Sequence, residues 1–272
     1  MARNTGIDNA KGDYICFCDS DDYIDRNMVE DCVKIVTSEN IELLHYGFHI
    51  ISADGNEKDI IKAEQIKIYS NNELNEKFIP GMLGYEPDLC KPIGLWMSLC
   101  GSFISLDLIK RANWRCESER NIISEDMYSL LELYNYVKKA GVTNKAYYYY
   151  CENANSLTHI FRADRYEKIK IFYEKTLERC VEINLSSEFY YLIKRYYISY
   201  TTAAIKQIAL SNITIKQKKK EICKICMDEL AKKLFIESAE DNYSLKQRLF
   251  NYLVIKNHRI LIMLICYLNK YV

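Results

Sequence analysis

The chain has 272 residues, which suits one large domain or two small ones. Its 37 lysines and arginines balance 37 aspartates and glutamates, so the formal net charge is zero. This balance does not imply a nucleic-acid partner, because proteins that bind the phosphate backbone usually carry a positive excess.

The 11 cysteines lie mostly within apolar runs, which predicts buried, reduced thiols in a cytoplasmic protein. Cys223 and Cys226 form one C-x-x-C pair, whereas a zinc site would need a second pair or two suitably spaced histidines. We therefore interpret the pair as two positions on one helix face. The apolar stretch at residues 260–268 is shorter than the ~20 residues that span a bilayer, and predicts a core helix or one lying flat on a membrane.

The first predicted elements surround an acidic loop. Residues 14–18 are continuously apolar, which is typical of a strand buried on both faces in a parallel sheet. The acidic loop, residues 19–22, follows directly. Asp25 is the predicted N-cap of a helix whose apolar side chains are Val29, Cys32, Val33 and Val36. Residues 41–52 have an ambiguous pattern that is compatible with another strand.

The second half of the chain becomes helical. Ser124 is the predicted N-cap of a helix that ends at Gly141, and residues 146–150 predict a strand. Glycine and proline are absent beyond residue 163, where we expect four or five helices. The sequence thus predicts an α/β domain over residues 1–162 and a helical region over residues 163–272.

The acidic loop offers oxygen ligands at close spacing. Asp19 and Asp21 are separated by one residue, so both carboxylates can point at one cation. Mg²⁺ and Mn²⁺ prefer oxygen ligands and often combine one or two carboxylates with substrate phosphates. A metal–diphosphate site is one interpretation of this spacing, and an acidic turn that precedes a helix is the other.

The surroundings of the loop resemble the family 2 glycosyltransferases. Residues 2–22 match the family pattern A-R-N-x-G-I-x-x-A-x-G-x-Y-I-x-F-x-D-S-D-D at nearly every fixed position. The resemblance implies a GT-A (Rossmann-like) fold that uses Mn²⁺ or Mg²⁺. It also implies that Asp21 is the direct metal ligand, that Asp19 lies nearer the ribose or donor sugar, and that Arg3 and Asn4 line the donor pocket.

A second block, S-E-R-N-I-I-S-E-D at residues 118–126, resembles a variant found in enzymes that build capsular polysaccharides and exopolysaccharides. The resemblance implies that Asp126 is the general base that deprotonates the acceptor hydroxyl, and that Glu125 positions this base or the acceptor. The alternative is that the two acidic residues only stabilise the first turn of a helix through its dipole.

A third block, at residues 148–159, resembles the segment that closes the catalytic domain in the same subgroup. It implies that His159 is a further metal ligand and that Arg162 or Arg165 neutralises diphosphate charge. A structural role for His159 is the alternative, and His45 and His49 are expected in the core or at a sheet edge. The segment Cys100-Gly101-Ser102-Phe103 departs from the W-x-K-L-[FY] motif of the family.

The chain begins inside the family pattern. In the family, the first strands and the acidic residue that contacts the nucleobase precede A-R-N. We therefore expect a partial GT-A domain that lacks its first strands, with impaired activity and an exposed sheet edge. The alternative is an inactive fragment or a non-catalytic assembly partner that needs another chain.

The predicted function is inverting transfer of a sugar from a nucleoside-diphosphate donor, by family a UDP-sugar. The predicted acceptor is a hydroxyl of a bacterial surface polysaccharide or lipid-linked glycan. Residues 259–270 are apolar with cationic ends, which predicts peripheral contact at the inner face of the plasma membrane. Homo-oligomerisation is left open, and the lysines at residues 216–220 are interpreted as a solvated face.

Overall fold

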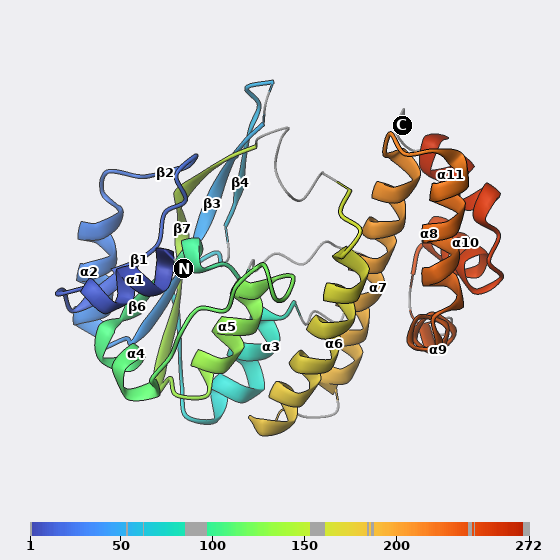
Figure 1. Ribbon diagram of the computed structural model, residues 1–272. Helices are drawn as coiled ribbons and strands as arrows, with labels where there is room; N and C mark the ends of the chain where they lie inside the picture. Colours follow the sequence, from blue (N-terminus) through green and yellow to red (C-terminus); the bar gives the residue numbers. More distant parts are fainter. Residues whose placement is uncertain are drawn as a thin grey trace. The chain divides into compact units, whose positions relative to one another are not determined.

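The structure is a computed structural model that describes residues 2–52, 54–61, 63–84, 97–152, 161–183, 185, 188–238, 241 and 243–268. The chain divides into two compact units, which are described separately (Figure 1). Unit 1 comprises Met1–Glu86, Ile93–Ala154 and Glu178–Ser186. Unit 2 comprises Pro87–Pro92, Asn155–Leu177 and Ser187–Val272.

Unit 1 is built on a seven-stranded sheet with the order β1-β6-β3-β7-β2, in which β4 also pairs with β3 and β5 with β7. The central strands β3 and β7 are parallel, and the other pairs are antiparallel. The strands are β1 (Tyr14–Cys16), β2 (Tyr23–Ile24), β3 (Leu43–Ile51), β4 (Glu57–Ile60), β5 (Lys67–Ser70), β6 (Ser102–Ser105) and β7 (Lys139–Cys151).

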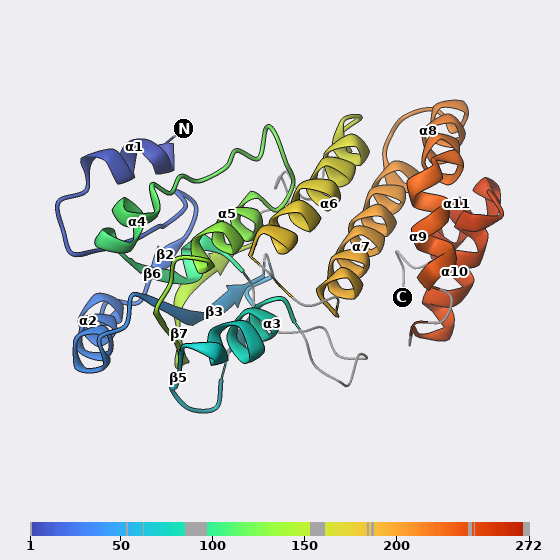
Figure 2. The same cartoon turned by 90° about the horizontal axis from the view of Figure 1, so that it is seen from below.

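Helices cover both faces of this sheet. Figures 1 and 2 show α2 on one side and α3 with α5 on the other. The helical segments of unit 1 are α1 (Ala2–Asn9), α2 (Met28–Glu39), a π-helical turn η1 (Leu74–Phe78), α3 (Ile79–Met82), a 3-10 turn η2 (Leu99–Gly101), α4 (Leu106–Ala112) and α5 (Glu125–Tyr134).

Strand β3 forms the centre of the core because it is covered on both faces. Every residue from Leu43 to Phe48 is buried. On one face Tyr46 packs edge-on against Tyr147, whose hydroxyl donates to Asp31 of α2 at 2.8 Å. On the other face His45 contacts Tyr134 of α5. Residues 41–52, whose sequence pattern was ambiguous, therefore contain a central strand. Its polar residue His45 makes hydrogen bonds inside the core.

Three local predictions were wrong. Strand β1 is not buried on both faces: it is half-buried and pairs antiparallel with β6 at the end of the strand order. Asp25 is not the N-cap of α2, because its carboxylate accepts from the N–H of Asn27, and Asn27 occupies the N-cap position without a capping hydrogen bond from its side chain. Gly141 does not end α5; it lies in β7, where a Cβ atom would come within 2.8 Å of Ile41.

Other local predictions were confirmed. Helix α5 begins after Ser124, and β7 contains the predicted strand at residues 146–150. Met28, Cys32 and Val36 form the buried side of α2, while Val29 and Val33 are exposed. The apolar spacing identified this helix, but it did not separate its buried side from its solvent side.

Unit 2 is entirely helical over the residues described. It contains most of α6 (Arg165–Glu182) and all of α7 (Glu188–Leu210), α8 (Ile215–Met227), α9 (Glu229–Glu237), α10 (Leu245–Ile255) and α11 (Arg259–Leu268). The sequence predicted four or five helices in this region, and the described residues form six. Cys223 and Cys226 both lie on α8, as predicted. Within the described part of the chain, none of the helices is both long enough and apolar enough to cross a bilayer.

Gly47 provides a test of the packing between β3, β4 and β7. A Cβ atom at Gly47 would lie 2.4 Å from the Ile60 carbonyl oxygen and 3.2 Å from the Ala146 Cα, both of which are backbone atoms. We expect Gly47→Ala to lower the free energy of unfolding by about 1–3 kcal/mol, measured by urea denaturation. Gly6→Ala is the matched control, because a Cβ atom there meets nothing within 4 Å and alanine favours α1 by about 0.5–1 kcal/mol. Equal midpoints for the two variants would contradict this packing.

Candidate active site

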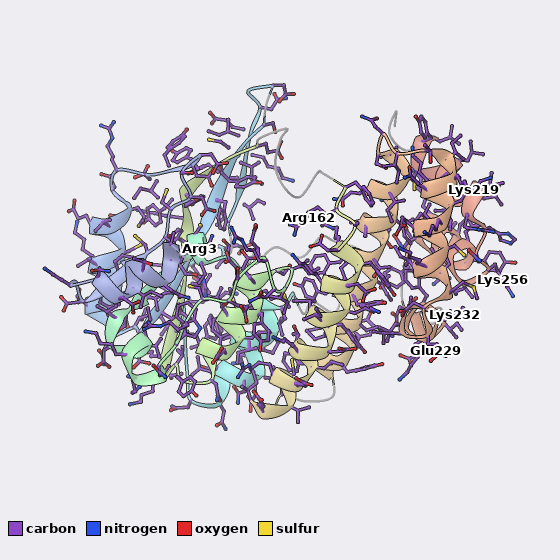
Figure 3. The ribbon with its side chains drawn as sticks, viewed as in Figure 1. Arg3, Arg162, Lys219, Glu229, Lys232 and Lys256 are labelled. Atoms are coloured by element: carbon purple, nitrogen blue, oxygen red, sulfur yellow. The ribbon has the colours of Figure 1, made fainter. Side chains whose placement is uncertain are left out.

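The candidate site is centred on the guanidinium group of Arg3, which extends from α1 (labelled in Figure 3). Its Nη1 atom lies 2.6 Å from Asp126 Oδ1 and 3.6 Å from Glu125 Oε1. Its Nη2 atom lies 3.1 Å from Asp19 Oδ1. Burial lowers the pKa of Arg3, but the Asp126 and Asp19 carboxylates outweigh this and hold it above its usual value. Arg3 therefore brings the predicted base and a residue of the predicted donor site together.

Asn4 fixes the helix that carries Arg3. Its Nδ2 donates to the Cys116 carbonyl at 3.0 Å, and its Oδ1 accepts from the Cys116 N–H at 2.9 Å. The adjacent Trp114 is tied to α5 by an Nε1–H bond of 2.7 Å to the Ser129 carbonyl. Asn4 thus holds α1 beside α5, and its predicted contact with a donor stays a prediction.

Asp126 lies in the first turn of α5 with each carboxylate oxygen engaged. Oδ1 pairs with Arg3, and Oδ2 accepts from the Ser98 hydroxyl at 3.2 Å and the Leu99 N–H at 3.0 Å. Burial raises the pKa of Asp126, while Arg3 and these donors oppose the shift. Only 17% of the side chain is exposed, so the position of this carboxylate is fixed by its partners.

Glu125 is the second carboxylate of the block and lies beside a pocket. Burial, reinforced by the neighbouring Asp126 charge, raises the pKa of Glu125 to about 7. Its proton is therefore exchanged near neutral pH, which makes Glu125 a second group able to hold or release a proton here. The resemblance gave this residue a positioning role and did not predict its titration.

The acidic loop is divided between a half-buried anchor and exposed carboxylates. Asp22 is the anchor: its carboxylate accepts from the Tyr148 hydroxyl at 2.7 Å and the Cys151 N–H at 2.8 Å. The Tyr148 hydroxyl in turn accepts from the Asp19 N–H at 3.0 Å. Asp19 and Asp21 are left exposed, with Asp19 facing Arg3. Asp22 therefore holds the loop backbone in place, and the exposed carboxylates of Asp19 and Asp21 can face a ligand.

The remaining predicted site residues are His159 and Arg162. His159 falls outside the described residues. Arg162 belongs to unit 2, where it pairs with Asp164 at 3.2 Å, so its predicted contact with a donor stays a prediction. Among the described residues, no group of three or more histidine, cysteine or acidic side chains is placed to hold a metal ion. A cation held here would have to complete its coordination from a ligand, as Mg²⁺ often does with substrate phosphates.

A pocket of about 630 Å³ opens beside Arg3 within unit 1. Its lining residues come from α1, the acidic loop, the segment before α5 and the first residue of α5: Ala2, Arg3, Asp19, Cys116, Glu117, Ser118, Glu119, Arg120 and Glu125. This volume lies within the usual range for small-molecule sites, about 300–1,000 Å³. The two sequence blocks that resemble the family therefore line one pocket.

A buried network behind Asp126 was missed by the sequence analysis. The Ser102 hydroxyl donates to the Ser98 carbonyl at 2.8 Å and lies 3.0 Å from His45 Nδ1. Because the Ser102 proton is used on Ser98, His45 Nδ1–H is the donor to the Ser102 oxygen and to the Gly101 carbonyl, 3.2 Å away. Nε2 then accepts from the Tyr134 hydroxyl at 2.9 Å. His45 thus braces the turn whose Ser98 and Leu99 hold Asp126.

His45 and His49 provide a matched test on one strand. His45→Ala removes the hydrogen bonds of the imidazole with Tyr134, Gly101 and Ser102 and leaves a cavity in the core, so we expect a loss of about 2–4 kcal/mol in unfolding free energy. His49 is partly exposed and pairs with Asp59, so His49→Ala should cost at most about 1 kcal/mol. Urea denaturation of both variants measures the difference. A loss at His45 no larger than the loss at His49 would contradict the bracing role.

Residues 1–87 match the family model described as glycosyl transferase family 2. EpsJ of Bacillus subtilis (strain 168), an uncharacterized glycosyltransferase, is 25% identical over 159 residues, which cover 58% of this chain and 43% of EpsJ. The glycosyltransferase GlyA of Streptococcus pneumoniae is 26% identical over 165 residues, which cover 59% of this chain and 22% of GlyA. This chain thus spans less than half the length of these curated relatives.

The fold is similar to that of S. aureus TarS, solved over residues 1–349 in complex with UDP-GlcNAc, with a TM-score of 0.57 at 16% identity. The similarity covers 94% of this chain and 68% of that structure. The prediction of a GT-A fold followed by a helical region is confirmed. Residues 1–87 of this chain are therefore similar to glycosyl transferase family 2, its curated relatives are glycosyltransferases, and the likeness to TarS shows the fold.

Proposed function

We propose that the chain transfers a sugar from a nucleoside-diphosphate donor to an acceptor hydroxyl, with inversion at the anomeric carbon. The observation that carries the proposal is the pairing of Arg3 with both Asp19 and Asp126 beside the pocket of about 630 Å³. This arrangement puts the acidic loop, which the family match covers, next to a buried carboxylate suited to proton transfer.

Asp126 is the proposed general base. It takes the proton of the acceptor hydroxyl as the oxygen attacks the anomeric carbon and the diphosphate departs. Ser98 and Leu99 hold the carboxylate in one orientation, so little reorganisation is needed when the proton arrives. Burial raises the pKa of Asp126 above the usual carboxyl value, which makes it a stronger base than an exposed aspartate.

Arg3 is the proposed group that couples donor binding to this base. Its guanidinium lies at the pocket wall and can form paired hydrogen bonds with phosphate oxygens. When it turns toward a donor diphosphate, its contact with Asp126 weakens and the pKa of Asp126 rises further. The base would then become most basic when a donor is present.

A divalent cation, Mn²⁺ or Mg²⁺, fits the exposed carboxylates of the acidic loop. Asp21 and Asp19 supply hard oxygen ligands, and the donor phosphates would supply more. Such a cation neutralises charge on the leaving diphosphate. Holding it is the role we propose for Asp21, since Asp22 is occupied with Tyr148 and Cys151.

The donor class is proposed by analogy with TarS, and the acceptor class from the resemblance of residues 118–126 alone. TarS was solved with UDP-GlcNAc and with UDP, so a UDP-sugar is the donor that we propose first. The proposed acceptor is a hydroxyl of a bacterial surface polysaccharide, capsular or exopolysaccharide, or of a lipid-linked glycan.

The pH dependence of the unfolding free energy tests the burial of Glu125. Its pKa in the folded chain, about 7, is higher than the ordinary glutamate value of 4.5, so the folded state holds this proton more tightly. The resulting stabilisation is complete below about pH 4.5 and disappears as the pH rises through 7. We expect the unfolding free energy of the wild type, relative to Glu125→Gln, to fall by on the order of 2 kcal/mol across this window. Denaturation curves at a series of pH values measure this, and a constant difference would contradict the buried state of Glu125.

Asp126→Asn tests the base. With UDP-GlcNAc and Mn²⁺ as probes, we expect UDP release to fall by about 10²–10⁴-fold, because asparagine cannot accept the proton. Asp107→Asn is the matched control; its side chain, on α4, is 83% exposed, and the rate should be unchanged. Full activity of Asp126→Asn would exclude Asp126 as the base.

Binding of UDP-GlcNAc is measured by calorimetry, separately from UDP release. Asp21→Ala should weaken UDP-GlcNAc binding in Mn²⁺ while leaving the unfolding midpoint unchanged, since Asp21 is exposed. If the wild-type chain binds neither UDP-GlcNAc nor any other nucleotide sugar with Mn²⁺, the proposed transfer is wrong for this chain. A non-catalytic assembly role would then be the better hypothesis.

A further inference from the structure

Two consecutive helices at the end of unit 2 expose apolar side chains along one stripe each. On α10, Leu245, Leu249 and Tyr252 are 84%, 53% and 52% exposed. The exposed residues of α11 are Ile260, Leu261, Leu264, Tyr267 and Leu268, each at least 47% exposed. In both helices these positions recur at three- and four-residue spacing, so each set lies on one side of its helix.

The opposite sides of these helices are already used in the core of unit 2. Phe250, Leu253 and Val254 of α10 are buried, as are Ile262 and Cys266 of α11. Helix α11 packs against α7, α8 and α10. The exposed stripes are therefore additional apolar surface, and folding of unit 2 does not need them. Exposed apolar stripes of this kind are typical of a docking site.

The charge of residues 245–268 indicates what kind of partner this surface binds. The whole chain is neutral, yet residues 245–268 contain Lys246, Arg248, Lys256 and Arg259 and no acidic residue. Lys219 of α8 adds to these cations: with His258 and Arg259 it lines a pocket of about 220 Å³ that also contacts Ile260 and Leu261. Figure 3 labels Lys219 and Lys256 in this part of unit 2. Cations thus lie beside the apolar stripe of α11.

We propose that α10 and α11 dock on an anionic lipid bilayer. The apolar stripes would enter the interface, and the lysines and arginines would lie at the level of the phosphate headgroups. A second copy of the chain fits less well, because a two-fold contact through this surface would bring cations against cations. The proposal does not rest on the proposed sugar transfer, and lipid binding is measured without any donor.

The test is co-sedimentation of the full chain with vesicles of phosphatidylcholine mixed with phosphatidylglycerol. We expect binding to these vesicles and little binding to pure phosphatidylcholine. Leu264→Glu should reduce the partition coefficient at least about tenfold, because it places a charge in the middle of the stripe. Val181→Glu is the matched control, since Val181 is a 76% exposed apolar residue of α6 outside this surface, and it should bind as the wild type does.

A second pair of variants tests whether the cationic side chains contribute to vesicle binding. Lys256→Gln should reduce binding to the anionic vesicles about fivefold, whereas Lys110→Gln on α4 should leave it unchanged. Circular dichroism checks that each variant is folded. The proposal is overturned if the wild type does not bind the anionic vesicles, or if Leu264→Glu binds them equally well. It is also overturned if light scattering shows a dimer that Leu264→Glu dissociates while vesicles are not bound.

Discussion

The candidate site depends on one ionic contact, the Arg3 guanidinium held among Asp19, Glu125 and Asp126. The contact joins α1, the acidic loop and the start of α5, and 123 residues separate its two ends in sequence. Asn4 prevents α1 from moving by binding both backbone atoms of Cys116. Removing Arg3 would leave three carboxylates at close range in a partly buried site, so their approach requires this cation.

Features encoded by neighbouring residues could be predicted from the sequence. Helix α5 is recognised from Ser124 and a regular apolar stripe, and the acidic loop from its position after an apolar run. Placement of a strand within a sheet is different, because it depends on distant partners. Residues 14–18 were expected inside a parallel sheet, yet β1 pairs antiparallel with β6, about ninety residues away in sequence. Likewise Gly141 resembled a helix stop but serves close packing against Ile41.

The residues that support the site were missed for the same physical reason. Ser98, Leu99 and His45 carry no motif, and their roles arise only when the η2 turn is folded against α5 and β3. A partial signal existed at Ser98, whose hydroxyl accepts from the Cys100 N–H and caps a single turn. His45 was expected in the core or at an edge. It lies in the core, where a polar ring needs partners at both nitrogens.

The balance of charge at the site gives a reason for a divalent cation. Arg3 contributes one positive charge against Asp19 and Asp126, even when Glu125, whose pKa is about 7, is protonated. The site is therefore negative, and the proposed donor diphosphate would add further negative charge. Two like charges roughly 4 Å apart cost about 4 kcal/mol at the effective dielectric near a protein surface. Arg3 alone cannot offset several such contacts, whereas a divalent ion beside Asp21 could bring the site and its donor close to neutrality.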